Sequence, residues 1–197
     1  MNLPDLTDSD IPTLLDRENI EIRAKDDPVW YHAPLIWIQI AIVAMSGKSP
    51  TAFSLTLPLL WGGAAVYLSE KYDVQPIRRG NAPLSSMPLV VHELTHAYQI
   101  LELGPIVFGF YYAVWPLPSG WTTRSTLEWE ADGNELKWIQ RKFGFTNTEE
   151  RKALKSAAEL FTGPTYLWPS FDAKGWEDAT RTLLWRDGDA RNHTDRG

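Results

Sequence analysis

The sequence predicts an α+β fold that is mostly helical. Several segments carry the apolar spacing and the end signals of amphipathic helices, and one short proline-containing segment predicts a strand. With 197 residues, 44% of them apolar, the chain is long enough to bury one hydrophobic core. We therefore expect a single domain over residues 1–197.

The part of the chain before that strand divides into a polar and an apolar segment. Residues 1–29 are polar, with a short helix expected after Asp8 or Ser9, and we interpret them as a surface arm. Residues 30–70 hold two apolar stretches around the turn SGKSP and predict a helical hairpin. A membrane span needs about 20 apolar residues, and both stretches are shorter or interrupted. We expect the hairpin to pack in a protein core, with membrane insertion as the alternative.

Residues 72–143 are expected to form the catalytic core. The stretch YDVQPIRRG predicts a short strand, and Pro76 places that strand at a sheet edge because proline donates no ladder hydrogen bond. Ser85 or Ser86 is expected to cap the following helix, which ends at Gly104.

A second long helix is expected in the stretch SGWTTRSTLEWEADGNELKWIQRKFGF, where Ser125 and Glu128 have the spacing of a capping box. Residues 144–185 predict further C-terminal helices, and residues 186–197 form a polar tail. The 1–197 domain thus has five successive segments.

Composition and charge narrow the classes of function. A net charge of −6 argues against nucleic-acid binding, because the binders of phosphate backbones present clustered Lys and Arg. The chain has no cysteine, so a metal site must use His, Asp or Glu. The N-terminal MNLPDLTDSD lacks the basic flank and apolar run of a signal peptide. We expect a cytoplasmic or virion-associated protein, with a membrane location as the alternative.

The stretch LVVHELTHAYQ places His92, Glu93 and His96 in an HExxH pattern. Residues i and i+4 of a helix lie one turn apart on the same side, so both imidazoles can reach one cation. Glu93 lies beside them. A separate apolar stripe on this helix is expected to face a core, formed by Val90 or Val91, Leu94, Ala97 and Leu101.

Together with the downstream stretch EWEAD, residues 128–132, this pattern resembles the gluzincin zinc metallopeptidases. In that thermolysin-like group, HExxH is followed by a Glu on a later helix. The chain also looks like small bacterial and phage-associated HExxH proteins with Tyr-Gln after the second His. The resemblance covers roughly residues 85–143 and implies a minimal zincin-like domain that binds Zn²⁺ through His92, His96 and one acidic residue.

Two glutamates in EWEAD compete for the third ligand position, and helix phase separates them. Glu130 belongs to an all-polar stripe that is expected to be solvated, formed with Asn134, Lys137 and Arg141. Glu128 shares its side with a mixture of apolar and acidic residues, so we expect Glu128 to be the ligand. Asp132 then fits the role of orienting a ligand histidine by accepting its other ring N–H.

The resemblance implies a zinc-dependent endopeptidase that acts on a peptide or protein substrate. Zinc would activate a water molecule, and Glu93 would act as the general base. An extended substrate would bind by adding to the expected edge strand at residues 73–79. The donor to the developing oxyanion stays open among Tyr98, Tyr111, Tyr112, Arg124, His32 and His193.

Two other functions remain open from the sequence. One is a membrane-embedded zinc protease, because hydrophobic segments precede HExxH. The other is a non-catalytic zincin-fold protein that serves as a structural or interaction component of a phage or a secretion apparatus. The presence of Glu93 argues against the second, since a structural zinc site needs no general base.

Overall fold

The computed structural model describes residues 3–45, 54–69, 71–113 and 123–144, together with isolated positions at 148, 152, 155, 175, 178, 181 and 182. The described part is mostly helical and contains one three-stranded sheet, which confirms the expected α+β class. The chain divides into two compact units, residues 1–109 and 110–197. The expected C-terminal helices and tail lie almost entirely outside the described residues.

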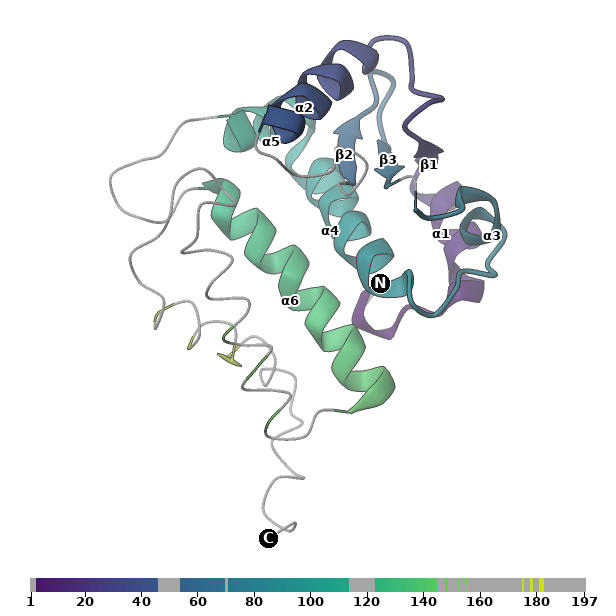
Figure 1. Cartoon of the computed structure of the whole chain (residues 1–197), viewed down its shortest axis with the longest axis vertical. Helices are drawn as coiled ribbons and strands as arrows, with labels where there is room; N and C mark the ends of the chain where they lie inside the picture. Colours follow the sequence, from purple (N-terminus) through teal and green to yellow (C-terminus); the bar gives the residue numbers. More distant parts are fainter. Residues whose placement is uncertain are drawn as a thin grey trace, which may run out of the picture. The chain divides into compact units, whose positions relative to one another are not determined.

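The first unit is built around a sheet with the strand order β1-β3-β2 (Figure 1). The central strand β3 pairs in parallel with β1 and antiparallel with β2, so β2 is an edge strand. The strands are β1 (Ile20–Ala24), β2 (Leu55–Pro58) and β3 (Ala64–Leu68).

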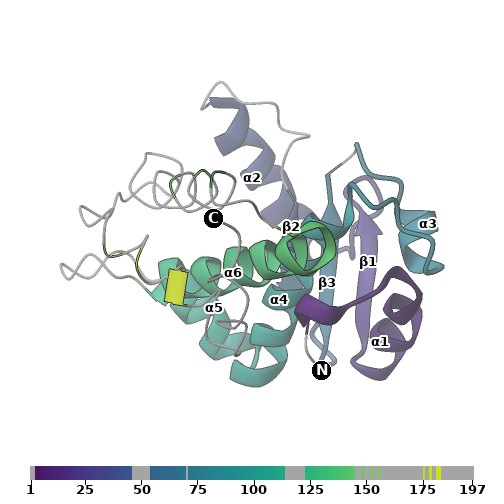
Figure 2. The same cartoon turned by 90° about the horizontal axis from the view of Figure 1, so that it is seen from below.

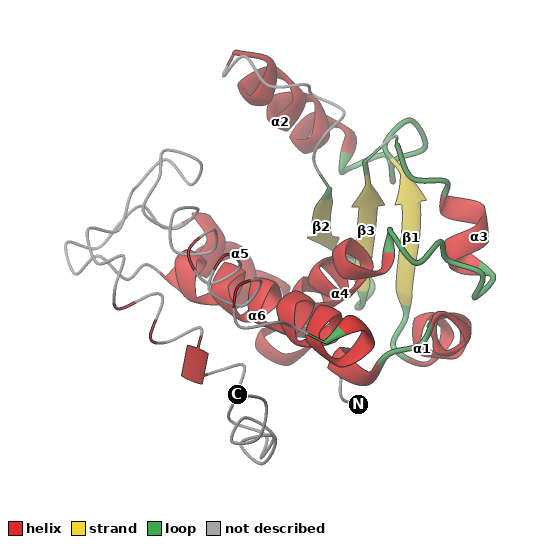
Figure 3. Ribbon diagram, turned by 60° about the horizontal axis from the view of Figure 1, so that its bottom comes forward, coloured by secondary structure: helices red, strands yellow, loops and turns green. Residues whose placement is uncertain are grey.

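The register of the sheet decides which side chains share a face. Thr56 and Ile22 both lie beside Val66 of the central strand, so these three side chains point to the same side. The helix α4 (Met87–Leu103) packs against β2 and β3, and Figure 3 draws it next to the strands. Leu57 points to the opposite side, toward an apolar cluster that includes Tyr67.

Three further helices surround this sheet. Near the N-terminus, α1 (Ile11–Arg17) and the short α3 (Val74–Arg78) both pack against β1, as Figure 2 shows. The apolar helix α2 (Ala33–Met45) adds Ile36 to the cluster around Tyr67. None of the helices in the described part of the chain is long and apolar enough to cross a membrane.

The second unit contains one long described helix, α6 (Thr123–Phe143). Leu127, Ala131 and Trp138 are buried on it, with the i, i+4 and i+11 spacing of one helix face. The helix already includes Ser125, so the capping box expected at Ser125 and Glu128 is wrong. Between this helix and α4, the chain forms α5 (Pro105–Ala113).

The strand expected at residues 72–80 is also wrong, because these residues form α3. The side chain of Asp73 caps this helix by accepting a hydrogen bond of 3.0 Å from the backbone N–H of Gln75. Pro76 falls in the first turn, where backbone N–H groups have no partner within the helix, so a proline is tolerated there. The edge strand nearest the HExxH helix is β2 instead.

The helical hairpin expected over residues 30–70 is half right. Its first stretch is the helix α2, but its second stretch forms β2, a turn and β3. The turn contains Gly62 and Gly63, whose positive φ angles of 88° and 95° do not fit a right-handed helix. Alternation in LTLP and the β-branched and aromatic residues of AAVYL favour strands on either side.

The N-terminal segment is not a surface arm. The expected short helix is present as α1, but β1 follows it and joins the sheet. Ile11, Leu14, Ile20 and Ile22 are at most 4% exposed. The average polarity of residues 1–29 concealed these four apolar residues, which occur with the spacing of a helix face and then of a strand face.

A buried hydrogen-bond network fastens the start of α2 to the sheet. Tyr67 donates its hydroxyl proton to Nδ1 of His32 over 2.8 Å and accepts the backbone N–H of Val29 over 3.0 Å. Nε2–H of His32 donates to the carbonyl oxygen of Pro58 over 2.9 Å. This arrangement requires a neutral imidazole, and burial lowers the pKa of His32 below its usual value.

Stability should therefore fall in mild acid through His32. The unfolded chain binds a proton at His32 near pH 6.5, whereas the folded protein holds the imidazole neutral. Below that pH the free energy of unfolding should decrease by at most about 1.4 kcal/mol per pH unit, until the lower folded pKa is reached. Chemical denaturation with a chelator present, from pH 7.5 to 5, measures this slope. His32→Gln should remove the contribution of His32 to this slope. Equal slopes in the variant and the wild type would show that His32 does not cause the loss of stability.

The turn between β2 and β3 yields a second stability prediction. A Cβ atom on Gly63 would overlap the carbonyl oxygen of Asn19, whereas a Cβ on Gly62 meets nothing within 4 Å. Gly62→Ala should lose about 1–2 kcal/mol through its positive φ alone. Gly63→Ala should lose roughly 1–3 kcal/mol more through steric overlap. Urea titration of both variants checks this order, and equal losses would rule out the close approach of Asn19.

Candidate metal centre

The helix α4 (Met87–Leu103) carries the HExxH pattern and has the ends that the sequence predicts. Ser86 stands at the N-cap position, but its hydroxyl donates to the Pro83 carbonyl, so the expected capping hydrogen bond is absent. Pro88 lies in the first turn. Gly104 ends the helix with a φ of 78°. Most of the expected apolar stripe is buried, namely Val90, Val91, Leu94 and Ala97, while Leu101 is only partly buried. Packing of this stripe fixes the rotation of the helix about its axis.

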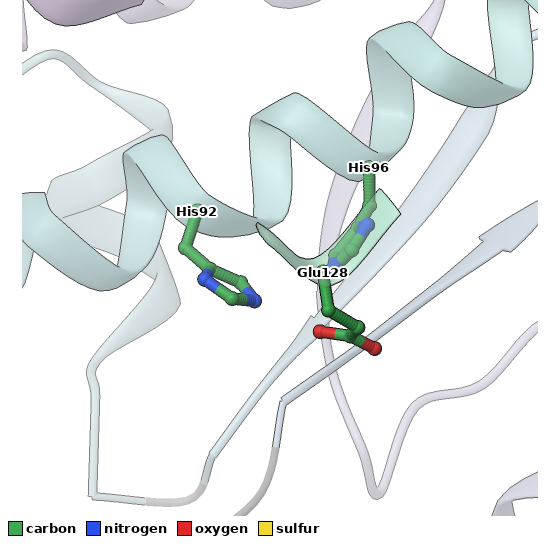
Figure 4. A group of neighbouring side chains, drawn as sticks. All are labelled: His92, His96 and Glu128. Carbon is green, nitrogen blue, oxygen red and sulfur yellow. The ribbon is translucent and has the colours of Figure 1, made fainter. Parts of the chain in front are cut away.

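The two histidines project from the same side of α4, as expected from their i, i+4 spacing (Figure 4). Their ring centroids are 4.9 Å apart, and the ring planes are nearly perpendicular, at 79°. His92 is partly exposed, and His96 is buried. Both imidazoles therefore lie one helical turn apart on a single rigid element.

Gln99 orients the second of these histidines. Nδ1 of His96 lies 2.8 Å from Oε1 of Gln99, one turn further along α4, and both side chains are buried. An amide oxygen only accepts hydrogen bonds, so Nδ1 carries the proton and the ring lone pair lies on Nε2. From the sequence, the orienting role was predicted only for Asp132, and the role of Gln99 was not predicted. The signal was present in the i, i+3 spacing of His96 and Gln99.

Glu93 is buried between α4 and the edge strand. Its side chain is 5% exposed, and its Oε2 accepts a hydrogen bond of 2.6 Å from the hydroxyl of Thr56 on β2. A buried carboxylate is stable only when hydrogen bonds or opposite charges compensate its lost hydration. The hydroxyl of Thr56 supplies one such bond, and sequence reasoning gave no sign of it.

The expected acidic residues lie on α6, in the second unit. Glu130 is exposed, as expected for the solvated stripe, and Glu128 is buried. Lys137 was placed on the solvated stripe as well, but it is buried, so that part of the expectation is wrong. Asp132 is partly buried on the same helix.

Among the described residues, two groups of side chains could hold a metal ion. One group consists of His92, His96 and Glu128, drawn in Figure 4, and the other of His92, Asp132 and Glu135. Within α4 itself, one ring nitrogen of His92 and one of His96 lie within 4.8 Å of each other.

The donors of the first group suit zinc. Two imidazole nitrogens and one carboxylate oxygen form the ligand set of many catalytic zinc sites, which keep a fourth position for water. The roles of Glu128 as ligand and of Asp132 as orienting residue stay predictions.

The structure describes the surroundings of only two of the candidate oxyanion donors, His32 and Tyr98. Both ring nitrogens of His32 are committed to the buried network with Tyr67 and Pro58, so His32 is not available as an oxyanion donor. Arg17 of α1 lies beside the hydroxyl of Tyr98, and burial raises the pKa of that hydroxyl. Tyr111, Tyr112 and Arg124 belong to described helices, but their side chains are not described, and His193 lies outside the described residues.

Comparisons with known proteins add no relative, because no family model, curated protein or solved structure matches the chain. The resemblance to gluzincins therefore rests on the residues themselves.

Removing the acceptor at Gln99 should weaken zinc binding. Gln99→Met keeps the length of the side chain but no longer fixes the tautomer of His96, so zinc affinity should fall by roughly 10- to 100-fold. Competition with a chromophoric chelator measures this affinity. Gln75→Met, at an exposed site on α3, is the matched control and should bind zinc as the wild type does. Unchanged affinity in Gln99→Met would show that the hydrogen bond does not serve the metal.

Proposed function

We propose that the protein is a zinc-dependent endopeptidase of gluzincin-like type, with His92, His96 and Glu128 as zinc ligands. One observation carries the proposal: a buried, hydrogen-bonded Glu93 lies on the same helix as two imidazoles that project from one side. Three ligand residues leave a fourth zinc position for water, as in catalytic sites.

Bound zinc would polarise the peptide carbonyl and lower the pKa of a water molecule toward about 7. The chain's own contribution to catalysis would be proton transfer by Glu93. Its carboxylate would accept the proton of the attacking water and return it to the departing amine. Water attacks the carbonyl carbon and the C–N bond breaks, so no covalent intermediate with the protein is required.

The geometry favours β2 as the strand that holds an extended substrate. β2 is an edge strand, it packs against α4, and its Thr56 contacts Glu93. A peptide that added to its outer edge would gain backbone hydrogen bonds and run beside the general base. This replaces the segment at residues 73–79, which forms the helix α3.

Replacing Glu93 tests the function most directly. Glu93→Gln should keep zinc and lose nearly all cleavage of a mixed peptide library, because an amide cannot accept the proton. Glu102→Gln is the matched control, since it makes the same change at an exposed site on the same helix. His92→Ala, His96→Ala and Glu128→Ala should each lose zinc, measured by metal analysis of the purified proteins.

The outcomes separate the alternatives. Cleavage that persists in Glu93→Gln would show that Glu93 is not the general base. Zinc binding without cleavage by the wild type would favour the non-catalytic zincin-fold protein. Retention of the expressed protein in membranes after carbonate extraction would favour the membrane-embedded protease.

A further inference from the structure

The edge strand β2 carries a single polar side chain, that of Thr56. Its hydroxyl lies 2.6 Å from Oε2 of Glu93 and 3.3 Å from the backbone carbonyl oxygen of the same residue. Thr56 is 7% exposed, and Glu93 is 5% exposed. The hydroxyl has one proton, and the bond of 2.6 Å is the shorter and stronger of the two, so the proton is donated to the side chain of Glu93.

A glutamate without such a bond can turn its carboxylate about three side-chain torsions. The bond to Thr56 holds Oε2 against the sheet, which leaves one orientation for Oε1. Proton transfer requires an approach of about 3 Å between heavy atoms, and a misplacement of 1 Å can lower a rate about 100-fold. The edge strand therefore controls the orientation of this carboxylate.

We propose that Thr56 is the positioning residue of Glu93, holding Oε2 so that Oε1 exchanges the proton with water and the leaving amine. This inference rests on the proposed endopeptidase function. The strand β2 would then have two roles, because its Thr56 side chain positions the general base and its backbone would hold the substrate. The register between a bound peptide and the general base is then set within β2.

Two variants of Thr56 separate positioning from a merely structural role. Thr56→Val keeps the shape of the side chain and removes the hydroxyl, so kcat should fall by roughly 10- to 100-fold. KM and zinc affinity should stay within about twofold. Thr56→Ser restores the hydroxyl and should recover most of kcat.

Ser86→Ala is the matched control. It removes another buried hydroxyl, at the start of α4, that bonds a backbone carbonyl away from Glu93. It should lower the melting temperature and leave kcat unchanged. Wild-type kcat in folded Thr56→Val, or an equal loss of kcat in Thr56→Ser, would overturn the proposal. So would a rise in KM without a change in kcat.

A double-mutant cycle tests the bond without using activity. Thr56→Val, Glu93→Met, which removes the acceptor oxygens, and the double variant are compared with the wild type by urea unfolding. A hydrogen bond to a charged group should appear as a coupling of about tenfold or more in the unfolding equilibrium constant. A wild type that cleaves nothing would remove the proposed function, and the cycle would still report whether Thr56 holds the carboxylate. Absence of coupling would overturn the positioning of Glu93 by itself.

Discussion

The packing of α4 against β2 and β3 is the constraint on which the candidate site depends. Successive residues of a helix are rotated by about 100°, so burial of Val90, Leu94 and Ala97 fixes the direction of every other side chain on α4. With that face fixed, Glu93 reaches the hydroxyl of Thr56, and the two histidines project together. The apolar contact has no chemistry of its own, but it sets the geometry of the polar groups.

Sequence predicted best where local signals decide the structure. Ser86 and Pro88 predicted the position where α4 begins, and Gly104 predicted where it ends, although the Ser86 hydroxyl makes no capping hydrogen bond. The separation of Glu128 from Glu130 was also predictable, because helix phase alone places them on different sides. The burial of Lys137 was not predicted, because helix phase does not show that a long aliphatic stem can be buried although the residue is charged.

The errors fell where distant segments decide the structure. Residues 64–68 form a strand because β1 and β2 pair on either side, and β1 lies more than 40 positions earlier in the chain. An apolar run in isolation does not reveal such partners, so a helix was as plausible as a strand. Thr56 was missed for the same reason, since its partner Glu93 lies 37 residues away. Gln99 was a different omission, because its partner His96 lies only three residues away.

The polar groups around α4 are difficult to explain as stabilising elements. A carboxylate at 5% exposure loses most of its hydration, and one hydroxyl bond recovers only a part of that loss. Apolar residues of similar volume at Thr56 and Glu93 would pack the interface between β2 and α4 at least as stably. The bond between His96 and Gln99 likewise fixes a tautomer, which matters little to packing and much to a bound cation. The proposed proton transfer by Glu93 and the proposed metal binding by His96 would each give these bonds a role that packing does not.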